Sequence, residues 1–120
     1  MAYTATHKYA RISPRKVRAL ADLVRGKFAD EALDILRFQP HRGARMLEKV
    51  IKSALGNAEH QQATGVDDLV VVDARVDGGP MIKRIRPRAR GMAFGIKRRM
   101  SHIKVALDSV AADAGSPAAE

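Results

Sequence analysis

Residues 78–99 read GGPMIKRIRPRARGMAFGIKRR, and this stretch decides how the chain folds. It separates two segments with strand-like alternation, 69–76 and 100–110, although antiparallel strands need only about two to five linking residues. Its glycines and prolines exclude a helix, and its apolar residues argue against a flexible linker. Both halves can instead continue the two strands outward, over a distance on the order of 35 Å at about 3.3 Å per residue. We therefore expect a long β-hairpin arm that protrudes from a globular body.

The arm also holds much of the positive charge. The chain of 120 residues has 22 Lys and Arg against 13 Asp and Glu, a formal charge of +9. Residues 1–25 contribute +5, residues 26–77 contribute −2 and residues 78–120 contribute +6. No acid occurs between Asp77 and Asp108, where nine cations do. A solvated surface usually mixes both signs, so this distribution favours a polyanionic partner.

Four arginines of the arm recur at every second position. In strand geometry Arg84, Arg86, Arg88 and Arg90 would share one side, with Pro87 on the other. A two-stranded ribbon is marginal in water on its own. We expect the arm to be ordered inside its partner, with guanidinium groups bonded to phosphates and with the apolar tip residues against bases, other proteins or a cavity wall.

The rest of the chain predicts an α+β body. Apolar residues at helical spacing indicate one helix from Ser13-Pro14 to a stop at Gly26, a short helix ended by residues 39–41, and a longer helix over 40–59. The expected buried faces are Val17, Leu20, Ala21 and Val24, then Phe28, Ala32, Ile35 and Leu36, then Ala44, Leu47, Ile51, Ala54, Leu55 and Ala58. Gly56 inside the third helix predicts close backbone packing there.

Three segments are expected to form strands. In 69–76, residues Val70, Val72, Ala74 and Val76 would share one face. Segment 100–110 would be its partner, and 3–12 alternates loosely as a third strand would. Residues 111–120, rich in Ala, Gly, Ser and Pro, are expected to be a flexible tail.

Two basic groups lie outside the arm. Arg15, Lys16 and Arg18 crowd the first turn of the first helix, where the helix dipole disfavours cations, so phosphate contact is the simplest explanation. The flank of the third helix carries a basic stripe, which an ordinary exposed face explains equally well because acids dilute it. The stripe consists of Arg42, Arg45, Lys49 and Lys52.

Other classes of protein are disfavoured. The absence of cysteine excludes disulfides and thiolate metal sites, and the lack of an apolar run of about 20 residues argues against a membrane span. The four histidines lack metal-ligand spacing, so we expect no enzyme, metal or cofactor. With two Tyr, three Phe and no Trp, a base-stacking platform is not expected either.

Two binding classes compete with an RNA-binding role. A winged-helix DNA-binding regulator has three helices followed by a strand, a basic loop and a strand, but a wing of 22 residues is long and no dimer seam is evident. A cationic membrane-active segment over 81–99 would need an amphipathic helix, which its prolines and glycines prevent.

Several motifs resemble one family over roughly residues 5–108. They are Pro14-Arg15-Lys16-Val17-Arg18, Leu23-Val24-Arg25-Gly26-Lys27, Asn57-Ala58-Glu59-His60, Asp77-Gly78-Gly79-Pro80, Lys83-Arg84-Ile85-Arg86-Pro87-Arg88-Ala89-Arg90-Gly91 and Arg99-Met100-Ser101-His102-Ile103. These motifs are similar to the bacterial-type large-subunit ribosomal protein twenty-two family. The chain departs from it at Met100, where the family often has Thr, and at the variable residues 92–94.

The resemblance implies a fold and a role. The fold would be three helices packed on a small three-stranded antiparallel sheet, with residues 1–110 as one rRNA-binding domain that includes the 78–99 arm. The protein would be a structural constituent of the large subunit of the cytoplasmic ribosome, would bind large-subunit (23S) rRNA and neighbouring ribosomal proteins, and would support assembly. The arm would run to the wall of the peptide exit tunnel, near the macrolide site, and meet the nascent peptide at its tip.

The resemblance also selects residues. Those expected to bind rRNA are Arg11, Arg15, Lys16, Arg18, Arg25, Lys27, Lys83, Arg84, Arg86, Arg88, Arg90, Lys97, Arg98, Arg99 and His102. Those expected to line the tunnel at the tip are Arg88, Ala89, Arg90, Gly91, Met92, Ala93 and Phe94.

Overall fold

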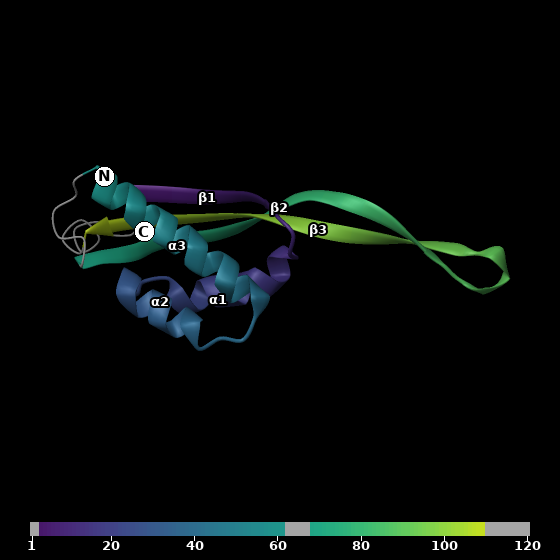
Figure 1. Cartoon of the computed structure of the whole chain (residues 1–120), viewed down its shortest axis with the longest axis horizontal. Coiled ribbons are helices and arrows are strands. Elements are labelled where there is room, and N and C mark those ends of the chain that lie inside the picture. The colour runs from purple at the N-terminus through teal and green to yellow at the C-terminus, as the bar shows by residue number, and fades with distance from the viewer. Residues whose placement is uncertain (1–2, 62–67, 110–120) are drawn as a thin grey trace.

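The first and last strands of the described residues pair with each other in one sheet. The structure, a computed structural model, describes residues 3–61 and 68–109 (Figure 1). Strand β1 (Tyr3–Ala10) precedes helices α1 (Pro14–Val24), α2 (Ala29–Arg37) and α3 (Arg42–His60). Strands β2 (Leu69–Pro87) and β3 (Ala93–Ser109) follow, joined by a 3₁₀ turn over Ala89–Gly91. The tail expected over 111–120 lies outside the described residues.

Strand β3 is the centre of the sheet. The strand order is β1-β3-β2 and both pairings are antiparallel, which confirms the expected α+β class and the third strand. Helix α3 packs on β1 and β3, and helix α1 packs on β2. The core between helices and sheet is almost wholly aliphatic, and its largest fully buried side chains include Leu36, Leu47, Ile51, Ile103 and Leu107. Within the described part of the chain, no helix is long and apolar enough to cross a membrane.

The helices bury most of the faces that their spacing predicts. All four residues named for α1 are buried, as are five of the six named for α3, while Leu55 is partly buried. Phe28 differs: it precedes α2 and is 43% exposed, so its place on the buried face of that helix is a wrong prediction. Ser13 stands at the N-cap of α1, as expected, but its side chain makes no capping hydrogen bond.

Close packing of α3 occurs at a different glycine from the one predicted. Gly56 has open space where a Cβ atom would stand, so the prediction of tight packing there is wrong. At buried Gly43 a Cβ atom would lie 3.2 Å from side-chain atoms of Ile12 and Val17. The first turn of α3 thus approaches the β1–α1 connection and α1 so closely that a side chain at position 43 would require its neighbours to shift by a few tenths of an ångström.

A β-bulge changes the predicted faces of β2. The pairing runs from Val71↔Leu107 to Asp73↔Ala106, so Val72 is an extra residue without a direct partner. An inserted residue reverses the alternation of sides. Val71 therefore joins the core together with Ala74 and Val76, whereas the sequence predicted Val70 and Val72 for that face.

The arm is the outer continuation of β2 and β3, as expected (Figure 1). A second irregularity, between Gly78↔Ser101 and Met81↔Arg99, separates it from the body. The molecule measures 64 × 28 × 27 Å, so its long axis exceeds the next by about 36 Å, close to the predicted reach. Its radius of gyration is 17.4 Å, against roughly 13.6 Å for a compact domain of this length. None of residues 77–100 is buried.

Candidate nucleic-acid interface

A basic groove lies where the arm meets the body. Its volume is about 1050 Å³, and it is lined by the β1–α1 connection, the first turns of α1 and α3, and the base of the arm. Eight cations line it, and no acid does: Arg11, Arg15, Lys16, Arg42, Arg84, Lys97, Arg98 and Arg99. Seven of them are among the residues predicted to bind rRNA, although they come from three separate parts of the sequence. We call this the junction groove.

Two helix N-termini open into the junction groove. The N-cap residues Ser13 of α1 and His41 of α3 both line it, and neither makes a side-chain capping bond. Neither first turn contains an acid. Because free backbone N–H groups and the positive end of the helix dipole attract anions, both termini add to the field of the eight cations. The groove is therefore suited to a polyanion such as a phosphate backbone.

The arm presents two chemically different faces. On one, each cross-strand pair joins a cation to an apolar residue: Ile82↔Arg98, Arg84↔Ile96 and Arg86↔Phe94. On the other, Lys83 stands directly opposite Lys97. Like charges opposite each other destabilise a ribbon, and no acid of the arm offsets them. The register thus supports the view that an anionic partner holds the arm in place.

The row of four arginines is shorter than predicted. Arg84 and Arg86 share a face and Pro87 lies on the other, as expected. Arg88 follows the end of β2, however, and Arg90 stands in the turn with φ +63°. Both arginines therefore leave the alternation of the strand. The guanidinium carbon of Arg88 lies 5.9 Å from the centre of the Phe94 ring, a cation–π contact across the tip.

Three of the predicted rRNA-binding side chains form hydrogen bonds that reach a different secondary-structure element. Arg18 donates from Nε to the carbonyl of Val76 at 3.1 Å, and Arg25 donates to the carbonyl of Ala74 at 2.5 Å. The first bond joins α1 to β2, and the second joins the C-cap residue of α1 to β2. His102 accepts the backbone N–H of Tyr9 at Nδ1, at 3.1 Å. These three side chains hold secondary-structure elements together, which spacing alone could not reveal.

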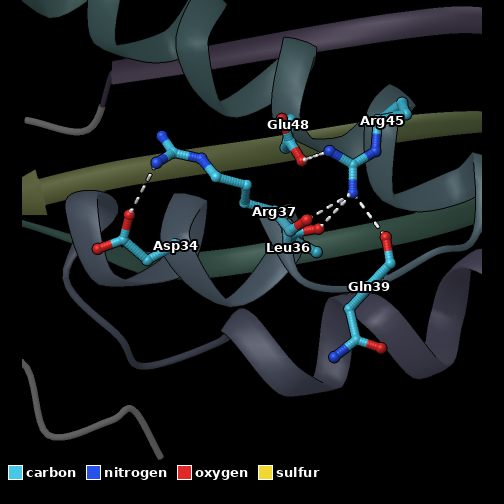
Figure 2. A network of polar contacts seen from close by, with 6 residues as sticks. All are labelled: Asp34, Leu36, Arg37, Gln39, Arg45 and Glu48. Carbon is cyan, nitrogen blue, oxygen red and sulfur yellow. Dashed lines mark hydrogen bonds and ion pairs between the residues drawn. The ribbon is translucent and has the colours of Figure 1, made fainter.

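The basic stripe on α3 divides into structural and free cations. Arg42 donates to the carbonyl of Arg11 and so fixes one rim of the junction groove, a role that sequence reasoning missed. Arg45 closes the C-terminal end of α2 (Figure 2): it donates to the carbonyls of Leu36 and Gln39 at 2.7 and 2.6 Å and pairs with Glu48 at 2.6 Å. Lys49 and Lys52 remain exposed.

Replacing Arg45 by Met is expected to lower the free energy of unfolding by about 1–3 kcal/mol, because carbonyls at the end of α2 and the Glu48 carboxylate lose a charged partner. Thermal or urea unfolding of the full chain measures this change. Lys52→Met, on the same helix without such partners, should change stability by less than about 0.5 kcal/mol. Equal effects of the two substitutions would contradict a capping role for Arg45.

The described residues contain no cluster of His, Asp and Glu that could hold a metal ion. Residues 1–2, 62–67 and 110–120 are not among the described residues.

Ser101 is completely buried, and its Oγ donates to the carbonyl of Ile12 at 2.6 Å. It therefore ties β3 to the β1–α1 connection that lines the groove.

Comparison with known proteins gives a consistent result. The family model described as ribosomal protein L22p/L17e matches residues 5–108. A protein of Rhodopirellula baltica named large ribosomal subunit protein uL22 is 65% identical over 113 residues, 90% of this chain and 95% of the relative. Relatives of the same name from Caldicellulosiruptor saccharolyticus and Desulfotalea psychrophila are 57% and 55% identical, each over 87% of this chain and over 85% and 94% of their own length.

Proposed function

The chain belongs to the ribosomal protein L22p/L17e family, and from that premise we propose that it binds large-subunit rRNA through its junction groove and its arm. As a member of this family it is a structural, non-enzymatic protein of the large subunit in the cytoplasmic ribosome. The winged-helix regulator is accordingly set aside. The proposal concerns the finer points: the RNA contacts, the course of the arm and its neighbours.

The observation that carries the proposal is the convergence of eight cations on one groove lined by no acid. Phosphate contacts supply most of the affinity of such surfaces and position the protein on the RNA. Four further predicted cations, Lys83, Arg86, Arg88 and Arg90, extend this surface along the arm, none of whose residues is buried. We propose that residues 1–110 act as one rRNA-binding unit and that it supports assembly by joining separate rRNA segments at groove and arm.

The arm tip is proposed to lie along the wall of the peptide exit tunnel. Two features support this: the arm reaches far beyond the body, and its end exposes Met92 and Phe94, which are 58% and 53% accessible. Exposed apolar side chains beside cations fit the wall of an RNA cavity through which a nascent peptide passes. Neighbouring ribosomal proteins are the other proposed partners.

Neutralising three groove cations tests the proposal. Arg15→Gln, Lys16→Gln and Arg99→Gln together are expected to weaken binding to a large-subunit rRNA transcript and to reduce the slope of log affinity against log salt by about 2 to 3. The matched control changes Arg37, Lys49 and Lys52 to Gln, which removes equal charge from outside the groove. Filter binding or fluorescence anisotropy at several salt concentrations measures both.

Two outcomes would count against the proposal. One is an equal loss in the groove and control variants, which would make the binding a general effect of charge. The other concerns sedimentation of a cell lysate through a sucrose gradient. The protein is expected to sediment with the large subunit. Sedimentation with duplex DNA alone would restore the winged-helix hypothesis.

A further inference from the structure

Tyr9 is held at the surface in an unusual backbone conformation. Its φ is +59°, where residues other than glycine are uncommon, and it lies at the irregularity of β1 between His7 and Ala10. The side chain is 59% exposed and does not belong to the core. A bulky residue in this backbone conformation costs free energy, and the burial of an exposed side chain does not offset that cost. Such outliers cluster at functional sites.

His102 fixes this conformation. The backbone N–H of Tyr9 donates to Nδ1 of His102 at 3.1 Å, and the two rings meet edge to face with centroids 5.0 Å apart and planes at 88°. Because Nδ1 accepts, the proton of a neutral ring lies on Nε2, for which no bond is seen within residues 3–61 and 68–109. The ring also packs over Gly79, where a Cβ atom would stand 3.3 Å from Cε1.

The aromatic pair adjoins the junction groove. Arg11 and Met100 line the groove, and Tyr9 and His102 stand two residues from them on β1 and β3. Residues two apart on a strand point to the same side, so Met100 and His102 share a face. On that face the partner of His102 across β2 is the exposed Asp77. His102 alternates with the buried Ser101 and Ile103, so this face is the one turned away from the helices. An RNA strand that leaves the groove past Arg11 or Met100 would come within reach of the pair.

We propose that Tyr9 and His102 form a binding site for one unpaired nucleobase of the rRNA. This inference rests on the proposed function. The face of the Tyr9 ring would stack on the base, and Nε2 of His102 would donate to an acceptor on its edge. The Asp77 carboxylate disfavours a phosphate at this point and can accept an N–H of the base. The sequence predicted no stacking platform, and the structure points instead to a site for a single base.

The composition of the molecular surface agrees with such a role. Four of the five aromatic side chains, Tyr9, Phe28, Phe38 and Phe94, are between 43% and 83% exposed. The core is built from aliphatic residues, so Tyr9 is not needed for packing. Substitution of its ring should therefore leave the body folded and change only what the ring contacts.

The test compares three variants of the full chain. Tyr9→Leu is expected to weaken binding to the rRNA transcript about tenfold with no change in salt slope, because stacking neutralises no phosphate. Tyr9→Phe should bind like the unaltered chain. The matched control is Phe38→Leu, which removes an aromatic side chain that lies elsewhere on the surface and is 83% exposed. This variant should also bind normally. Thermal melting of each variant verifies that it is folded.

A second readout identifies the base. Chemical probing of the rRNA should show one unpaired nucleotide that is protected by the unaltered chain and by Tyr9→Phe but not by Tyr9→Leu. The chain has no Trp, so Tyr9→Trp provides a single Trp that can be excited selectively and whose emission should be quenched by the RNA. Normal affinity and protection with Tyr9→Leu would overturn the inference while leaving the proposed function intact. Failure of the unaltered chain to bind the transcript would overturn the proposed function itself.

Discussion

Replacing residues 82–98 by Asn-Gly is expected to leave the body folded while the salt slope of rRNA binding falls by about 5 to 6. The replacement removes seven cations, and each neutralised phosphate contributes about 0.7 to 0.9 to the slope. Met81 and Arg99 are cross-strand partners just beyond the body, and Asn-Gly is the preferred two-residue turn between antiparallel strands. The shortened ribbon can therefore close without disturbing the sheet.

The body should melt cooperatively in this variant. The nearest core residues to the cut are Val76 and Ile103, and residues 77–100 contribute no buried side chain. Removing the arm also removes the repulsion between Lys83 and Lys97, so stability should not fall. Circular dichroism during thermal unfolding measures this. Loss of a cooperative transition would show that the arm belongs to the folding unit of the body.

A second variant separates charge from length. It keeps the ribbon and changes the same seven cations to Gln, namely Lys83, Arg84, Arg86, Arg88, Arg90, Lys97 and Arg98. Phosphate-dominated binding predicts the same loss of slope in both variants. If the tip lies at the exit tunnel as proposed, only the shortened arm should also remove the apolar tip from the tunnel wall and alter the response of cells to macrolides. An unchanged slope in the Gln variant would contradict the proposed role of the arm cations.

The elements of this fold were predictable because their signals are local. Helical spacing in α1 and α3 is set by which side chains must be buried, and the arm follows from a linker too long for a hairpin and too apolar for a loop. The bulge at Val72 was not predictable. A single inserted residue leaves the β-branched composition unchanged, yet it reverses which valines face the core.

The residue composition of the candidate site was predictable from the sequence, but the role of each of its cations was less so. Arg15 and Arg99 are both exposed and line one groove, as the excess of positive charge in their two segments of the chain suggested. Arg18 and Arg25 look the same in sequence, but each bonds a carbonyl of β2. Which cations have internal partners depends on contacts between residues about 50 or more positions apart, and charge patterning carries no information on such contacts.

Replacing Ile103 by Ala is expected to lower the free energy of unfolding by about 2–5 kcal/mol. Ile103 is completely buried in the central strand, between His7 of β1 and Val76 of β2, so its truncation leaves a cavity that neighbouring strands cannot fill. Since domains of this size have about 5–15 kcal/mol of stability in total, the melting temperature should fall by roughly 8–20 °C.

The matched control is the same substitution in the same pair of strands. Ile85 lies in the arm and is 77% exposed, so Ile85→Ala removes an equal number of carbon atoms from a side chain that packs on nothing in the body. We expect a change in stability within about 0.5 kcal/mol, measured by urea unfolding of both variants. If Ile85→Ala destabilised the protein as much as Ile103→Ala, the arm would have a core of its own in solution, and the need for an RNA partner to order it would disappear.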